Sequence, residues 1–248
     1  MSTPAELNDP LYPQPRSISG VANLISRAEI VAAMGDDAPT PLQILLSRAH
    51  RARYQQQDVL YHHGNDSSTV FFITAGLVKL VAYLPSGRAR IVRLHRPGSI
   101  LGLGGLLGFC HEHTGVAVTA VSVLRLPLCA LQRLRSEDPA SYIGLAERWH
   151  GYLQDADMWI TQFSTGPIRG RVARLLALLA SFEPATATGQ LQLLSCDEMA
   201  SILGVTIESV SRTLAQFKRQ HILTCDDRKP TEFYDTDIPR LRSIAEEL

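Results

Sequence analysis

The sequence predicts an α+β fold in three parts: an N-terminal antiparallel β-roll, one long helix and a C-terminal winged helix-turn-helix. Three observations lead to this prediction. Short apolar segments separated by turn residues fill 59–126, a long amphipathic pattern covers 138–164, and two short helical segments joined by a glycine turn occupy 195–220. We place the parts at 1–40 (an N-terminal extension), 41–135 (the roll), 136–165 (the long helix) and 166–248 (the C-terminal domain).

The composition is that of an ordinary globular protein. The chain has 248 residues, of which 45% are hydrophobic and 19% charged, and 24 basic residues balance 24 acidic ones. No apolar run approaches the roughly 18 residues of a membrane helix, and the N-terminus has no signal-peptide pattern. We therefore expect a cytoplasmic protein without a membrane partner. The four cysteines lie far apart and are expected to be thiols.

The first 40 residues are rich in proline and are predicted to form an extension, interrupted by a short helical pattern at Val21–Met34. A short amphipathic segment, Leu42–Ala49, leads into the roll. Many short strands with turn residues between them are typical of an antiparallel barrel or roll. The predicted strands are Val59–Tyr61, Val70–Ile73, Leu77–Leu84, Arg88–Leu94, Ser99–Leu101 and Thr114–Leu126.

The long helix, about 25 residues by its pattern, carries two apolar stripes. The wide stripe runs through Leu145, Trp149, Tyr152, Ala156, Trp159 and Phe163, and the second through Ile143, Leu153 and Ile160. Because two apolar faces need two partners, we expect one to pack on the roll and the other on a second copy of the helix. The alternative is one helix buried in a monomer core. The predicted dimer residues are Trp149, Leu153, Ala156, Ile160 and Phe163.

A break after the long helix is predicted at Gly166–Pro167, which we interpret as a hinge or a domain boundary. A helix at Ile168–Phe182 and a polar loop at Glu183–Gln190 follow. After the helix-turn-helix described next, Ile222–Tyr234 has the pattern of two short strands and predicts a wing.

The segment from Leu194 to Leu223 predicts the function. Ser195 followed by Glu198 is a capping box that begins a helix, Gly204 supplies a left-handed turn, and Thr206 caps a second helix. Two short helices joined in this way form a helix-turn-helix, whose second helix enters the major groove of DNA. The predicted inner positions of that second helix are Ile207, Val210, Leu214 and Phe217.

The outer face of the second helix has the chemistry of base recognition. Arginine donates to guanine, glutamate accepts from cytosine, and serine does either. The predicted DNA-binding residues are Thr206, Glu208, Ser209, Ser211, Arg212, Lys218 and Arg219, the last two toward phosphates. Residues 166–248 hold 10 Lys and Arg against 11 Asp and Glu, so we expect specific rather than strong non-specific binding. A plain solvated helical hairpin is the alternative interpretation.

These parts, in this order, resemble the cyclic-AMP-receptor/FNR superfamily of bacterial transcription regulators over about residues 41–245. The most specific match, Val205–Arg212, is similar to the recognition-helix pattern of the FNR branch. The resemblance implies a cyclic-nucleotide-binding-like jelly roll, RNA polymerase as a partner, and base reading by Glu208, Ser211 and Arg212. Ile207 stands where the cyclic-AMP branch has an arginine, which favours TTGAT-type half-sites.

The residues that bind cyclic AMP in that family do not match here. The positions of the ribose and phosphate contacts look like Leu103, His113 and Thr114, and those of the adenine contacts like Ala156 and Asp157. Losing an arginine–phosphate contact costs about 1.5–3 kcal/mol, so we do not expect cyclic AMP. The first cysteine is Cys110, so the N-terminal cysteines that hold an iron–sulfur cluster in FNR are missing and that cofactor is not expected either.

The effector pocket is predicted to be apolar, which suits a hydrophobic effector or haem better than a charged nucleotide. A redox or gas signal and a constitutive protein without a ligand are the alternatives. Cys110, His111 and His113 have metal-ligand chemistry, but without further ligands at a familiar spacing no metal site is predicted. His95 is expected on the surface. The predicted pocket residues are Leu101, Gly102, Leu103, Gly104, His113, Thr114, Ala156 and Asp157.

We therefore predict a regulator and not an enzyme: a homodimer on a pseudo-palindromic operator, its recognition helices about 34 Å apart, with an effector in the roll that shifts the long helix. Two other classes of protein stay open. One is a ligand-binding module that has lost DNA binding. The other is a cupin-like enzyme or sensor whose roll holds a metal through His62, His63, His111 and His113.

Overall fold

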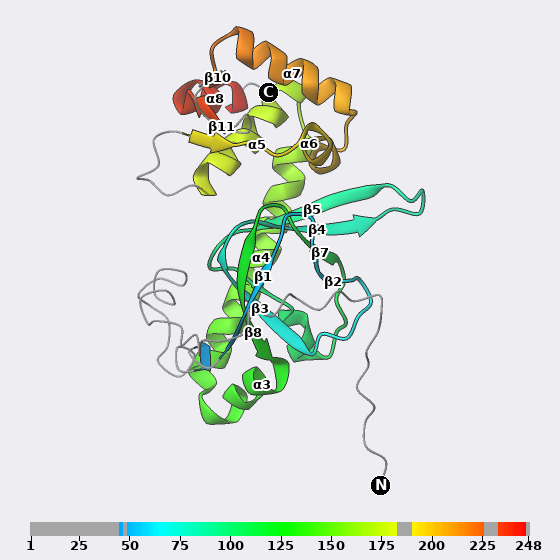
Figure 1. The fold of residues 1–248 in the computed structure, drawn as a ribbon, viewed down its shortest axis with the longest axis vertical. Helices are drawn as coiled ribbons and strands as arrows, with labels where there is room; N and C mark the ends of the chain where they lie inside the picture. Colours follow the sequence, from blue (N-terminus) through cyan, green and yellow to red (C-terminus); the bar gives the residue numbers. More distant parts are fainter. Residues whose placement is uncertain (1–44, 47–48, 183–189, 226–232, 247–248) are drawn as a thin grey trace.

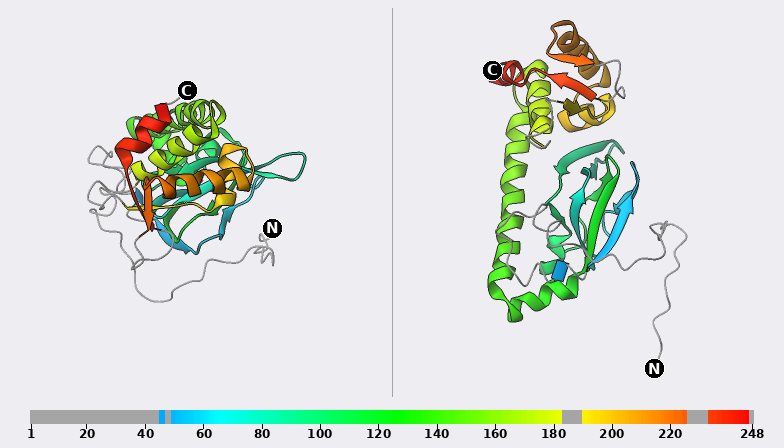
Figure 2. Two further views of the ribbon diagram at one scale, coloured as in Figure 1. Left: turned by 90° about the horizontal axis from the view of Figure 1, so that it is seen from above. Right: turned by 60° about the vertical axis from the view of Figure 1, so that its left-hand side comes forward.

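The computed structural model describes residues 45–46, 49–182, 190–225 and 233–246. A β-roll and a C-terminal domain lie at opposite ends, and the 26-residue helix α4 (Pro139–Ser164) runs beside the roll and joins them (Figures 1 and 2). The α+β class and the order of parts are as predicted. The helical pattern at Val21–Met34, and with it the whole extension 1–40, lies outside the described residues.

Two four-stranded antiparallel sheets form the roll, with strand orders β1-β8-β3-β6 and β2-β7-β4-β5. Strand β3 shows why they stack: Phe71 and Ile73 point into the core between the sheets, whereas Val70 and Phe72 point to the core under the helices. The strands are β1 (His50–Tyr54), β2 (Val59–Tyr61), β3 (Thr69–Ala75), β4 (Val78–Tyr83), β5 (Ala89–His95), β6 (Ile100–Leu101), β7 (Thr114–Ala117) and β8 (Val121–Pro127).

Two elements of the roll differ from the sequence prediction. The single strand expected at Thr114–Leu126 is two strands, because β7 pairs with β4 in one sheet and β8 pairs with β3 in the other. Strand β1 was not predicted, since only Ala52 and Tyr54 of its five residues are buried and the polar residues dominate its pattern.

Helices α3 (Leu128–Glu137) and α4 pack against the roll through Leu131, Leu134 and Leu145. The sequence analysis did not separate α3 from the region before the long helix. The two helices meet at Asp138, whose side chain caps α4 by accepting a hydrogen bond from the backbone N–H of Ser141. A 3-10 helix, Leu103–Leu107, follows β6.

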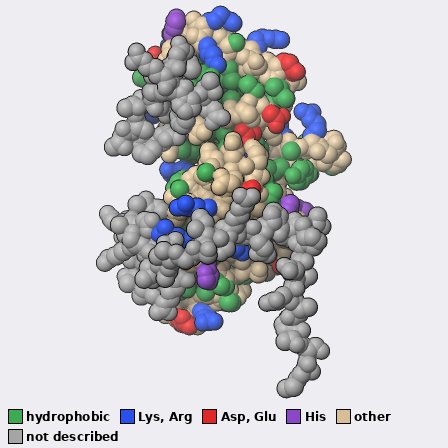
Figure 3. Space-filling model, in the orientation of Figure 1, with side chains coloured by type: hydrophobic (Ala, Val, Ile, Leu, Met, Phe, Trp, Pro, Cys, Tyr) green, Lys and Arg blue, Asp and Glu red, His purple; other side chains and the backbone are tan. Residues whose placement is uncertain are grey.

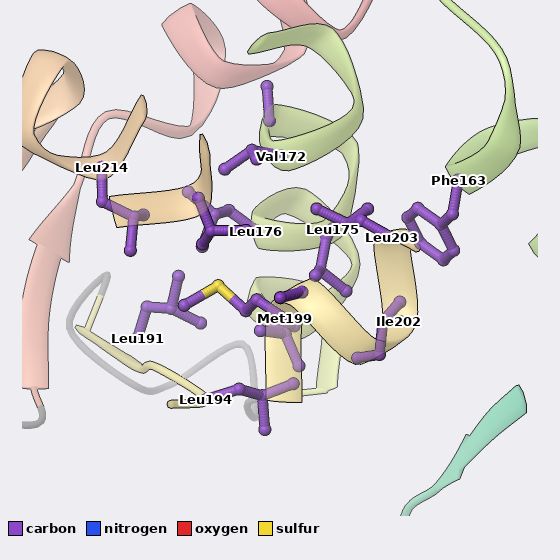
Figure 4. Close-up of a cluster of buried hydrophobic side chains, with 14 of the residues drawn as sticks. Phe163, Val172, Leu175, Leu176, Leu191, Leu194, Met199, Ile202, Leu203 and Leu214 are labelled. Atoms are coloured by element: carbon purple, nitrogen blue, oxygen red, sulfur yellow. The ribbon is translucent and has the colours of Figure 1, made fainter. Parts of the chain in front are cut away.

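The C-terminal domain packs four helices and a small sheet, of strand order β10-β11-β9, around one core (Figure 4). The wing prediction falls on β10 and β11, which pair antiparallel; residues 226–232 between them lie outside the described residues. Helix α8, whose Leu241 and Ile244 are buried, was not predicted. The elements are α5 (Ile168–Phe182), β9 (Gln190–Gln192), α6 (Cys196–Leu203), α7 (Ile207–Arg219), β10 (Leu223–Cys225), β11 (Phe233–Thr236) and α8 (Ile238–Glu246).

None of the helices in the described ranges is both long and apolar enough to span a membrane.

Candidate nucleic-acid interface and effector pocket

Local hydrogen bonds fix the turn of the helix-turn-helix. The hydroxyl of Ser195 accepts from the N–H of Glu198 at 3.2 Å, and the Glu198 carboxylate accepts from the N–H of Ser195 at 3.1 Å. This is the predicted capping box. Gly204 ends α6 with φ of 66°, and the Thr206 hydroxyl caps α7 by accepting from the N–H of Ser209 at 3.3 Å.

Helix α7 has one buried and one exposed face. Val210, Leu214 and Phe217 are buried in the domain core, as predicted, but Ile207 is 46% exposed. The assignment of Ile207 to the inner face was wrong, because Ile207 is the first residue of α7 and the buried face of the helix begins at Val210. Ile207 therefore belongs to the exposed surface of the helix.

The exposed surface of α7 carries the predicted reading residues. Glu208, Ser211, Arg212 and Arg219 are all exposed and recur at spacings of three, four and seven. The backbone N–H of Glu208 itself, followed by the Thr206 hydroxyl, keeps the pKa of the Glu208 carboxyl below its usual value, so this side chain is an anionic hydrogen-bond acceptor. Figure 3 shows Lys and Arg side chains along the top of the molecule, the end that α7 occupies in Figure 1.

Three predicted DNA contacts already have roles inside the domain. The Ser209 hydroxyl lies 3.0 Å from that of Thr206, and both belong to the cap. The ammonium of Lys218 donates to the Tyr234 hydroxyl at 2.8 Å and lies 4.5 Å from the ring centre. Lys218 thus connects α7 to β11, and Arg219, seven residues after Arg212, is exposed on the same face of α7 as Arg212.

Arginines of α5 hold the junction between α4 and the C-terminal domain. Arg171 donates from Nε to the carbonyl of Phe163 at 2.7 Å and also reaches the carbonyl of Leu203 in α6. Arg174 donates to the carbonyls of Gln162 at 2.7 Å and Thr165 at 2.6 Å. The helix does break at Gly166–Pro167 as predicted, but its last carbonyls are fixed by these guanidinium groups.

The C-terminal domain docks on the roll through α6. Lys79 of β4 and Glu198 form an ion pair at 2.8 Å, with about a tenth of each side chain exposed. The Ser201 hydroxyl accepts from the N–H of Ile91 at 3.1 Å and donates to the carbonyl of Ala89 at 3.0 Å, both in β5. Sequence reasoning missed this interface, since nothing in the local pattern of Lys79 or Ser201 identifies a partner more than a hundred residues away.

A cavity of about 560 Å³ lies beside this interface, with Leu77, Leu194 and Met199 in its wall. Its charged groups already have partners: Glu198 pairs with Lys79, Lys218 bonds Tyr234, and Arg96 lies over the Phe182 ring. A smaller cavity inside the roll has polar groups without partners, so we regard the smaller one as the candidate ligand site.

The roll pocket has a volume of about 210 Å³ and includes five of the eight predicted residues: Leu101, Gly102, Leu103, Gly104 and His113. The other three predicted residues do not line this cavity. Thr114 is buried away from the pocket, and its hydroxyl accepts from the N–H of His63 at 3.1 Å. Ala156 and Asp157 do not line the pocket, because α4 presents Trp149, Tyr152 and Leu153 to it instead.

Two pocket residues that sequence reasoning missed come from β5. Arg93 and His95 line the pocket, and His95 is only 3% exposed, so its assignment to the surface was wrong. Burial, with the nearby charges of Arg93 and His113, lowers the pKa of His95 to about 3, and the imidazole is neutral at neutral pH. The pocket was predicted to be apolar, but Arg93 and His95 give it a polar part.

The Cys110–His113 segment does not assemble a metal centre. His111 stacks on the Tyr61 ring with centroids 3.8 Å apart, and burial lowers its pKa to about 4. Cys110 is exposed and lies 3.7 Å from a carboxylate oxygen of Asp66. Within the described ranges no group of three or more His, Cys, Asp or Glu is placed to hold a metal, so the cupin-like hypothesis has no geometric support there.

The fold and the exposed face of α7 define a transcription regulator with a helix-turn-helix and a β-roll. Two family models match the chain: a cyclic nucleotide-binding domain over residues 51–138 and a Crp-like helix-turn-helix domain over residues 170–244. The chain belongs to the CRP/FNR family of DNA-binding transcription regulators, which are not enzymes.

Relatives agree with this assignment. The transcriptional regulator LdrP of Thermus thermophilus is 27% identical over 180 residues, 71% of this chain and 89% of the relative. A probable transcriptional activator of Rhizobium leguminosarum bv. viciae is 31% identical over 169 residues, 66% of this chain and 69% of the relative. The structure of FixK2 from Bradyrhizobium japonicum has the same fold, with a TM-score of 0.72, 23% identity and coverage of 81% and 98% of the two chains.

We expect the Lys79–Glu198 pair to contribute to stability in a pH-dependent way. Although burial opposes ionisation, the hydrogen bonds from Lys79 and Ser195 lower the pKa of Glu198 from its ordinary 4.5. A lowered pKa in the folded state stabilises the protein above pH 4.5, and that stabilisation is lost as pH falls through the lower folded value. Lys79→Met should therefore reduce the free energy of unfolding by about 3 kcal/mol at neutral pH and by less in acid. Urea unfolding measures this, with the exposed Arg88→Met as control; equal losses at both pH values would contradict it.

Proposed function

We propose that this regulator is a cytoplasmic homodimer that binds a pseudo-palindromic operator with TTGAT-like half-sites. A ligand in the roll pocket controls its binding to DNA. The observation that carries the proposal is the division of α7 into a buried apolar face and an exposed face with Glu208, Ser211 and Arg212. These three side chains have the donors and acceptors that base edges require. RNA polymerase is the further partner expected at a promoter.

An uncovered stripe on α4 supports the homodimer. Ile143 is 56% exposed, Leu153 53% and Ile160 62%, which is unusual for large apolar side chains on one helix. With Ala146, His150 and Asp157 between them, the residues alternate at spacings of three and four, the repeat of a two-helix seam. A second copy of α4 would cover the stripe.

Two residues predicted for the dimer contact lie elsewhere. Trp149 packs against the core under the roll, and Phe163 is 3% exposed in the core of the C-terminal domain. Ala156 is half-buried on the side of α4 that faces its own chain. The seam that we propose therefore keeps Leu153 and Ile160 from the earlier set and adds Ile143.

The roll pocket is placed to act on this seam. Leu153 lines the pocket and also belongs to the exposed stripe. On the same helix, Arg148 donates to the carbonyl of Gly98 at 2.6 Å and the Tyr152 hydroxyl accepts from the N–H of Ile100 at 2.7 Å. A ligand that changes these contacts changes how α4 meets its copy, and thereby how the two α7 helices are presented.

Arg212→Ala should remove sequence preference and leave the fold intact, because Arg212 is exposed and makes no contact with the core. We expect binding to TTGAT-type operators to weaken about 5- to 150-fold per half-site, corresponding to about 1–3 kcal/mol, while scrambled DNA is bound as before. Gel-shift titration measures both affinities. A wild-type protein that does not distinguish the operator from scrambled DNA would overturn the proposal.

Arg219→Ala is expected to act differently, through loss of a phosphate contact. Affinity should fall by a similar factor on every sequence, and the slope of log affinity against log salt should decrease by about 1 per subunit. Fluorescence anisotropy at several salt concentrations tests this; a change confined to one base position would show that Arg219 reads a base.

Ile160→Glu should convert the dimer into monomers, since a carboxylate placed in an apolar seam loses its hydration without a partner. Met158→Glu is the matched control, because Met158 is 43% exposed on the same helix but lies off the stripe. Sedimentation equilibrium measures the mass. If both variants stay dimeric, the seam lies elsewhere.

A further inference from the structure

A β-bulge in β5 gives the roll pocket its polar character. Leu80 pairs with Arg93 and Val81 pairs with Ile91, so Val92 is an extra residue without a partner across the ladder. Opposed residues share a face, and Leu80 points into the core between the two sheets. The bulge thus turns Arg93 inward, whereas Ile91 points outward to the C-terminal domain.

The same register places His95 opposite Val78, which is fully buried in that core. Without the bulge, Arg93 and His95 would share the outward face of Ile91. Arg93 and His95 therefore face the inside of the roll because of one inserted residue in the backbone, and not because of a side-chain rotamer.

Both side chains have unused hydrogen-bonding atoms. The Nε atom of Arg93 and the Nε2 atom of His95 are buried, and no described residue bonds either of them. Asp155 and Glu112 influence Arg93 through their charge, but no carboxylate in the described ranges forms an ion pair with it. Since buried polar groups are nearly always hydrogen-bonded, the Arg93 Nε–H indicates an acceptor that belongs to a ligand, and the neutral His95 ring donates to the same acceptor when its proton is on Nε2.

The charge and size of the pocket restrict that ligand. Arg93 is the one cationic side chain among the residues that line it, and Glu112 is the one carboxylate. Burial lowers the pKa of His95, His111 and His113, so these imidazoles are neutral at neutral pH. A guanidinium binds a carboxylate through two parallel hydrogen bonds. At about 210 Å³ the cavity is smaller than the roughly 300–1,000 Å³ typical of drug-sized ligands, and Leu101, Leu103 and Trp149 provide apolar walls.

We infer that the roll pocket binds a small organic monocarboxylate with an apolar or aromatic body, held by Arg93 and His95. The carboxylate meets the two unpartnered nitrogens, and the body lies between β6 and α4. This inference deepens the proposed function by naming the class of effector. The position of the arginine on β5 also explains how the pocket can bind an anion although the cyclic-nucleotide contacts are replaced.

Tryptophan fluorescence tests the inference, because Trp149 lines the pocket. In a Trp159→Phe background Trp149 is the single tryptophan, since the chain has two. The probes are benzoate, phenylacetate and hexanoate, each with its neutral amide as control. We expect the carboxylates to change the emission saturably and the amides to have little effect. Circular dichroism checks that the background variant is folded.

Arg93→Gln should weaken carboxylate binding about 10- to 100-fold, Arg93→Lys should weaken it less, and the exposed Arg88→Gln should leave it unchanged. Three results would overturn the inference: no response to any carboxylate at millimolar concentration, equal binding by Arg93→Gln, or an Arg93-dependent response only to inorganic phosphate or cyclic AMP.

Gel shifts of the same proteins separate this inference from the proposed function. Operator binding that no carboxylate or Arg93 variant affects, with no fluorescence response, overturns the ligand and leaves the DNA-binding proposal standing. Arg93-dependent carboxylate binding without any operator preference supports the ligand and overturns the operator proposal.

Discussion

Helix α4 packs against both domains of its own chain, and the arrangement of the whole chain depends on how its side chains are divided between them. Leu145 and Trp149 pack under the roll, and Phe163 enters the core of the C-terminal domain. These contacts bury the two ends of the wide apolar stripe and partly cover the residues between them. The remaining large apolar residues, such as Leu153 and Ile160, face solvent in the single chain. Both domains of one chain are thus fixed to one side of the helix, and the other side is left for association.

The capping box of α6 has a second use at the domain interface. Glu198 accepts from Ser195, which begins the helix, and from Lys79, which belongs to the roll. The Glu198 carboxylate therefore both caps the first helix of the helix-turn-helix and binds that helix to the roll. In this docked arrangement Glu208, Ser211 and Arg212, the residues predicted to read bases, are exposed.

The sequence predicts best what is decided locally. The Ser195–Glu198 box, the turn at Gly204 and the cap at Thr206 involve residues three or four apart, and all three are found. Periodicity also predicts the length of α4 but not which neighbour each stripe meets, so Trp149 and Phe163 were assigned to the wrong partner. His95 was misplaced for another reason: an inserted residue reverses the alternation of β5, and the alternation itself carries no sign of the insertion.

The hydrogen bonds at the end of α4 couple the orientation of this helix to the position of the C-terminal domain. Because Arg171 and Arg174 fix the last carbonyls of α4 to α5, a movement of the end of α4 is transmitted to the C-terminal domain and also acts on the contacts of α6 with the roll. Twenty-six residues span about 39 Å. A tilt of about 5° at the roll then moves the far end by roughly 3 Å, close to the 3.4 Å spacing of successive nucleotides along a DNA strand. In the homodimer that we propose, such a tilt would shift each α7 by about one nucleotide step along the DNA.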